Sequence, residues 1–145
     1  MDSSLSAPTY EYEAGPGLGN TIEVAPGVHW LRMPLPFKLN HINLWLLEDN
    51  GDDGDGWTIV DTGIDLDEVR EAWKVILSGR ISESKPLKRV LVTHFHPDHF
   101  GLAGWLTQKY KVPLWMPREE WAQAQILSME TNAYSRDSFS MFYHA

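Results

Sequence analysis

Cysteine is absent from this chain of 145 residues. Without a thiol the chain cannot form a disulfide, present a thiolate nucleophile or bind a metal ion through sulfur. Any metal ion would therefore have to be held by histidine and carboxylate side chains.

Positive charge is also scarce, because 12 basic residues face 20 acidic ones and the net charge is −8. Such a chain has no general positive field to attract nucleic-acid phosphates or anionic lipid. The one locally basic stretch, KPLKR at residues 85–89, is predicted to be a solvated loop. We therefore expect a small-molecule substrate and no nucleic-acid or membrane partner.

Long apolar runs are missing as well. No stretch approaches the roughly 20 apolar residues that a membrane-spanning helix needs. The first residues show no charged segment followed by an apolar one, so no secretory signal is predicted. With 43% hydrophobic and 22% charged residues, the composition is typical of one globular domain. We expect a soluble, cytoplasmic protein.

The first half of the chain reads as a lead-in followed by strands. Residues 1–20, rich in Ser, Gly and Pro, predict a poorly ordered lead-in, with a single domain over residues 21–145. TIEV at 21–24 and VHWL at 28–31 predict two short strands joined by a turn. NHINLWLL at 40–47 and WTIVD at 57–61 predict a strand pair across the acidic turn EDNGDDGDG.

The second half alternates helices with strands. Apolar residues recur at helical spacing from Leu66 to Leu77, and Asp65 is the expected N-cap of that helix, which should end at Ser78 and Gly79. RVLVTH at 89–94 predicts a buried strand, followed by a helix to about Lys111, a strand in VPLWM at 112–116 and a helix opened by Pro117. This order predicts an α/β fold with ligands at the carboxyl end of a strand.

One segment at such a strand end, VTHFHPDHFGLAGW at residues 92–105, concentrates groups that bind metals. It holds His94, His96, Asp98 and His99, although the whole chain has only six histidines. On an extended segment His94 and His96 point the same way, and beyond Pro97 the chain turns so that the other two can face a neighbouring point. Desolvating this cluster without a cation would be costly, so we expect two adjacent divalent-metal positions. His29, His41 and His144 are each predicted to be ordinary core or surface residues.

HFHPDH, together with LPFKLNHINLWLLED at 35–49 and WTIVDTG at 57–63, resembles the metallo-β-lactamase fold hydrolases over roughly residues 22–127. The resemblance implies an αββα sandwich and a metal-bound hydroxide that hydrolyses an ester, thioester, lactone or amide, or less often a phosphodiester as in phosphodiesterases and nucleases. It implies two zinc ions, with iron or manganese as alternatives. The implied roles are His94 and His96 at the first metal, Asp98 and His99 at the second, Asp98 also orienting the nucleophile, and Asp61 as an outer-shell support. From the residues alone, Asp61 could equally be a strand-end turn residue before Gly63.

The same resemblance implies ligands that lie further along the chain. Family members bring a third histidine, a bridging carboxylate and a final histidine from a later portion, and here only His144 follows the last predicted helix. We therefore interpret the chain as the first half of such a domain, a mixed sheet with helices on one face. Its bare face predicts self-association. A catalytically incomplete metal-binding half-domain that needs a partner, and a structural α/β module, remain alternatives.

Overall fold

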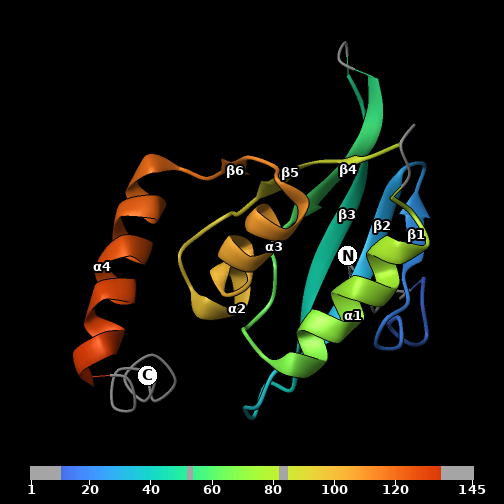
Figure 1. The fold of residues 1–145 in the computed structure, drawn as a ribbon. Coiled ribbons are helices and arrows are strands. Elements are labelled where there is room, and N and C mark those ends of the chain that lie inside the picture. Colours follow the sequence, from blue (N-terminus) through green and yellow to red (C-terminus); the bar gives the residue numbers. More distant parts are fainter. Residues whose placement is uncertain (1–10, 52–53, 82–84, 135–145) are drawn as a thin grey trace, which may run out of the picture.

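The computed structural model describes residues 11–51, 54–81 and 85–134. Its centre is a six-stranded sheet in the order β1-β2-β3-β4-β5-β6 (Figure 1). The first four strands are antiparallel neighbours, whereas β4, β5 and β6 run parallel. The strands are β1 (Ile22–Ala25), β2 (Val28–Pro34), β3 (His41–Gly51), β4 (Gly54–Val60), β5 (Leu87–Leu91) and β6 (Leu114–Trp115).

Within the described residues, four helices connect or follow the parallel strands, as the alternating pattern predicts. The helices are α1 (Asp67–Ser78), α2 (Pro97–Phe100), α3 (Ala103–Tyr110) and α4 (Arg118–Tyr134). Helices α1 and α3 lie in front of the sheet in Figure 1, and α4 stands beside it, beyond β6. The predicted α/β order is confirmed. Parallel neighbours need a crossover connection, which α1 provides between β4 and β5, and α2 with α3 between β5 and β6.

The core lies between the sheet and helices α1 and α3. Leu46, Ile59 and Val90 are register partners on β3, β4 and β5, and each is fully buried. Trp73 of α1 and Leu106 of α3 are also fully buried in this core. The alternation of buried and exposed residues along β3 is what a strand with one covered face requires.

The other face of the sheet carries a row of apolar side chains. The pairing of neighbouring strands shows that each strand contributes one residue to this row. Two of these residues, Trp45 and Trp115, are exposed. A mixed sheet with helices on one face is therefore confirmed, whereas self-association through the other face stays a prediction. The row consists of Ile22, Trp30, Trp45, Val60, Leu91 and Trp115.

Two sequence-based expectations about local structure were wrong. Asp65 does not cap α1; its carboxylate instead forms two hydrogen bonds of 2.8 Å with the Arg70 guanidinium, one turn into the helix. Part of KPLKR is strand rather than solvated loop, because Arg89 pairs with Thr58 in the sheet and forms an ion pair of 3.0 Å with Asp49. A competing ion pair five residues along the chain decides the first case, and pairing with a neighbouring strand decides the second.

The acidic turn is also shorter than expected, since β3 continues to Gly51 and β4 begins at Gly54. In the lead-in, residues 1–10 lie outside the described residues, and residues 11–20 form no helix or strand. No helix in the described part of the chain has both the length and the apolar character to cross a membrane.

Candidate functional site

The metal-ligand motif lies where the sheet gives way to helices. Strand β5 ends at Leu91, and the amide of Val92 still donates to the carbonyl of Trp115. His96 then adopts an extended conformation with φ −58° and ψ 142°, as the residue before a proline usually does, and α2 begins at Pro97. The predicted turn at Pro97 is confirmed, and the carbonyl of His96 accepts from the amide of His99.

This turn gathers the four predicted ligands. The ring centroid of His94 lies 4.8 Å from that of His96 and 3.9 Å from that of His99. The Nε2 atom of His99 is 3.6 Å from a carboxylate oxygen of Asp98. Among the described residues, however, no three His, Asp or Glu side chains are already arranged as a metal-binding set. The four side chains are close neighbours, and the three histidine rings would have to reorient around a cation.

Asp61 connects the end of β4 to this cluster. It has a φ of 61°, in the left-handed region that non-glycine residues seldom adopt, and its carboxylate is buried. That carboxylate accepts hydrogen bonds from the Thr93 amide at 2.7 Å and the Thr93 hydroxyl at 2.9 Å. The Oδ2 oxygen that accepts the Thr93 hydroxyl also lies 2.8 Å from Nδ1 of His99. Asp61 is thus a strand-end turn residue in contact with a predicted ligand, and its contacts suit an outer-shell role.

Burial and neighbouring charges shift two pKa values in this cluster. Burial alone would raise the pKa of Asp61, but hydrogen bonds from His99 and Thr93 outweigh it, and the net pKa is lowered. The pKa of His94 is lowered by its burial and by the positive charges that His99 and His96 would carry. Both shifts favour an ionised carboxylate beside a neutral imidazole at neutral pH, which are the protonation states that bind metals.

Thr62 fixes the backbone of His99, and sequence reasoning missed it. Its amide and its hydroxyl each donate to the His99 carbonyl at 2.8 Å, and the hydroxyl accepts from the amide of Leu102. The indole nitrogen of Trp73 donates to the Thr62 carbonyl at 2.7 Å, so α1 supports the same point. Thr62 follows Asp61 directly in VDTG, and that adjacency was the available signal.

Glycine at position 101 permits this close approach. A Cβ atom there would come within 2.5 Å of the Pro97 carbonyl oxygen and 2.9 Å of the Gly63 carbonyl oxygen. The end of α2 therefore packs directly on the backbone that follows β4. This contact holds His99 against Asp61 and Thr62.

Two further residues touch the other side of the motif. The Thr93 hydroxyl lies 2.9 Å from Nδ1 of His94. The amide of Phe95, between His94 and His96, donates to a carboxylate oxygen of Glu120 at 3.0 Å. Glu120 belongs to α4, 25 residues along the chain, so no local pattern could have identified it.

Histidines outside the motif have other surroundings. His29 packs edge-on against Trp57, with ring centroids 5.3 Å apart, and burial together with Arg80 lowers its pKa. His41 hydrogen-bonds through Nδ1 with the side chain of Asn40 at 2.7 Å. His144 lies outside the described residues. The prediction that these three are ordinary residues stays a prediction.

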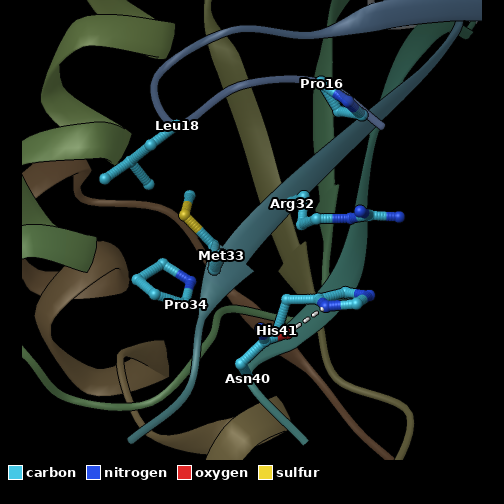
Figure 2. Close-up of a pocket in the computed structure, with 7 residues that line it drawn as sticks. All are labelled: Pro16, Leu18, Arg32, Met33, Pro34, Asn40 and His41. Carbon is cyan, nitrogen blue, oxygen red and sulfur yellow. Dashed lines mark hydrogen bonds between the residues drawn. The ribbon is translucent and has the colours of Figure 1, made fainter. Parts of the chain in front are cut away.

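A pocket of about 320 Å³ adjoins His41 and the lead-in (Figure 2). Figure 2 shows Arg32 and His41 pointing to one side of β2, while Leu18, Met33 and Pro34 point to the other. Its lining residues are Pro16, Leu18, Arg32, Met33, Pro34, Asn40 and His41.

The donor chemistry of the motif fits a divalent cation. Imidazole and carboxylate ligands suit zinc, iron and manganese alike, and no thiolate is present to narrow the choice. The contact between Asp61 and Nδ1 of His99 leaves Nε2, which lies 3.6 Å from an Asp98 oxygen, as the ring nitrogen that could bind a cation, in the way outer-shell carboxylates orient metal-binding histidines. The candidate ligands are His94, His96, Asp98 and His99.

Comparison with known proteins gives consistent matches. A solved beta-lactamase domain protein from Burkholderia ambifaria superposes with a TM-score of 0.72 and 51% identity, over 79% of this chain and 37% of that one. A linear primary-alkylsulfatase from Pseudomonas sp. (strain ATCC 19151) is 47% identical over 47 residues, which are 32% of this chain and 8% of that protein. The probable metallo-hydrolase YqjP of Bacillus subtilis (strain 168) is 29% identical over 72 residues, 50% of this chain and 21% of that protein.

The chain thus spans well under half the length of each of these relatives. A family model described as the metallo-beta-lactamase superfamily matches residues 38–133, which include β3, the Asp61 turn and the whole histidine motif. Fold, motif and family match agree, and the chain belongs to the metallo-beta-lactamase superfamily.

Proposed function

We propose that this chain carries the metal-binding part of a hydrolase that uses two divalent cations, zinc by preference. The observation that carries the proposal is the contact of His99 with Asp61 beside the gathered rings of His94 and His96. Its relatives support a metal-dependent hydrolase in general, since one match is a probable metallo-hydrolase and the family model covers the motif.

Within this proposal each residue has a distinct task. His94 and His96 would hold the first cation, and Asp98 and His99 the second. A bound cation would supply the nucleophile by lowering the pKa of water toward neutrality. Asp98 would also orient the attacking water, and Asp61 would keep His99 in the tautomer that leaves Nε2 free.

The proposed substrates are compounds with an ester, thioester, lactone or amide bond. A second candidate class is the sulfate ester, favoured by the 47% identity with an alkylsulfatase, and phosphodiesters are a third. Because the chain spans only 37% of the matched solved chain, residues that a relative adds beyond this span could complete the site. A catalytically incomplete half-domain that needs a partner is therefore the alternative proposal.

The test is hydrolysis by the zinc-loaded chain. We expect turnover of one model compound among a thioester, a lactone, an alkyl sulfate and a phosphodiester, and loss of it in His96→Ala. His41→Ala, which changes a histidine outside the motif, is the matched control and should keep the activity. Tight zinc binding without turnover would favour the incomplete half-domain, and absence of zinc binding would contradict both proposals.

A further inference from the structure

Helix α4 reaches the metal-ligand motif through one side chain. Glu120 lies in the first turn of α4, and its carboxylate accepts the amide of Phe95 at 3.0 Å. In Figure 1 the segment between β5 and α2 bends toward the side on which α4 stands. The carboxylate is partly buried, and its distance to the backbone amide is that of an ordinary N–H···O hydrogen bond.

The contact matters because that amide lies between two of the candidate ligands. The Phe95 peptide separates His94 from His96, so fixing it fixes the backbone from which both rings project. Elsewhere in the turn, the Thr93 amide is held by Asp61 and the carbonyl of His96 by the amides of His99 and Phe100. Glu120 holds the peptide between these two anchored points.

We propose that Glu120 is a positioning residue for the first cation: by holding the Phe95 amide, it sets the directions of the His94 and His96 rings. This inference rests on the proposed function, because it assigns a partner to the same metal site. Outer-shell partners of metal ligands typically change metal affinity by about 10- to 100-fold when they are removed.

Glu119 offers a matched control. It precedes Glu120 in the same helical turn, carries the same charge and is exposed. Glu119→Ala therefore removes an equal charge from the neighbouring position of the same helical turn. Glu120→Gln removes the charge but keeps an oxygen that can accept the Phe95 amide.

The experiment measures cobalt(II) binding to the full chain by its visible absorption spectrum, in competition with a chelator. We expect about tenfold weaker binding and a changed spectrum for Glu120→Ala. Glu120→Gln and Glu119→Ala should stay within about threefold of the parent chain. Equal affinities for the two alanine variants would overturn the proposal, and so would a Gln variant as weak as Glu120→Ala, because charge alone would then explain the effect.

A second readout separates this inference from the proposed function. In the metal-free chain, hydrogen exchange of the Phe95 amide should be faster in Glu120→Ala than in Glu119→Ala, at unchanged melting temperature. If the parent chain bound no cobalt, the proposed function would fail, and amide exchange would still decide whether Glu120 holds this turn. Unchanged Phe95 exchange in Glu120→Ala would contradict the positioning role.

Discussion

The two ends of the HFHPDH motif are held very differently. At the carboxyl end, His99 is fixed at both its ring and its backbone: Asp61 contacts Nδ1, and Thr62 donates two hydrogen bonds to its carbonyl. At the amino end, Nδ1 of His94 contacts the hydroxyl of the exposed Thr93, and Glu120 of α4 accepts a hydrogen bond from the Phe95 amide.

The His99 end is ordered by the sheet and its core, whereas the His94 end depends more on a contact from α4. Asp61 and Thr62 follow β4, and Trp73 of α1 supports them from the core, so the His99 end is part of the stable centre of the domain. The His94 end shares Asp61 through the Thr93 amide, but its remaining backbone contact comes from the first turn of a helix beyond the last strand. We expect substitutions at the His99 end to cost stability, and those at the His94 end to affect metal binding more than stability.

The largest effect is expected from Asp61→Ala. The change leaves the Thr93 amide and Nδ1 of His99 without their acceptor and places alanine at a φ of 61°. The expected loss is about 3 kcal/mol of unfolding free energy. Asp61→Asn keeps one acceptor and tolerates this backbone better, so it should lose less. Urea unfolding of the metal-free variants measures both, and equal stability of Asp61→Ala and the parent would contradict the anchoring role.

Acidification should remove the stabilisation that the ionised Asp61 carboxylate provides. The pKa of Asp61 is lowered in the folded chain, so its stabilisation is complete above the unfolded value of about 3.8 and disappears as pH falls through the lower folded value. The stability difference between the parent chain and Asp61→Asn should therefore be nearly constant above pH 5 and shrink below about pH 4. Urea unfolding across pH tests this sign, and a difference that grows on acidification would contradict it.

A smaller loss is expected from Thr62→Val. The valine side chain has a similar shape but cannot donate to the His99 carbonyl or accept the Leu102 amide, in a position that is fully buried; the backbone amide keeps its bond to that carbonyl. The expected cost is about 1 to 2 kcal/mol. Thr62→Ser keeps the hydroxyl and serves as the control; if serine and valine were equally destabilising, the hydrogen bonds would not be the cause.

The smallest loss of stability is expected from Thr93→Val, at the His94 end. The hydroxyl contacts Nδ1 of His94 and a carboxylate oxygen of Asp61, but Thr93 is exposed and its amide keeps its bond to Asp61. We expect less than about 1 kcal/mol of unfolding free energy. A loss equal to that of Thr62→Val in the same urea titration would show that both ends of the motif are anchored alike.

The sequence predicted the α/β order and the turn at Pro97, because hydrophobic periodicity and proline act locally. It also placed the candidate ligands His94, His96, Asp98 and His99 in one turn, since four side chains within six residues need little long-range information. The strand pairing of Arg89 depends on a distant partner, Thr58. The ion pair that takes Asp65 away from the helix cap is local, with Arg70 five residues along the chain, but the capping pattern does not show which of the two contacts forms.

The supports of the candidate site show the same limit. Thr62 stood beside a residue that the sequence singled out, yet its two bonds to His99 depend on α2 folding back onto β4. Glu120 contacts the motif from a helix beyond the next strand, and in the sequence it is one glutamate among many. Outer-shell contacts arise from packing between elements, so they become visible only in the folded chain.

The most direct test of the metal site is the zinc content of the purified chain after incubation with zinc and exhaustive dialysis. We predict that the parent chain retains zinc, that Glu119→Ala retains as much, and that a variant with alanine at His94, His96, Asp98 and His99 retains none. A parent chain that retains no zinc, or a fourfold variant that retains as much as the parent, would contradict the assignment of these four side chains as metal ligands.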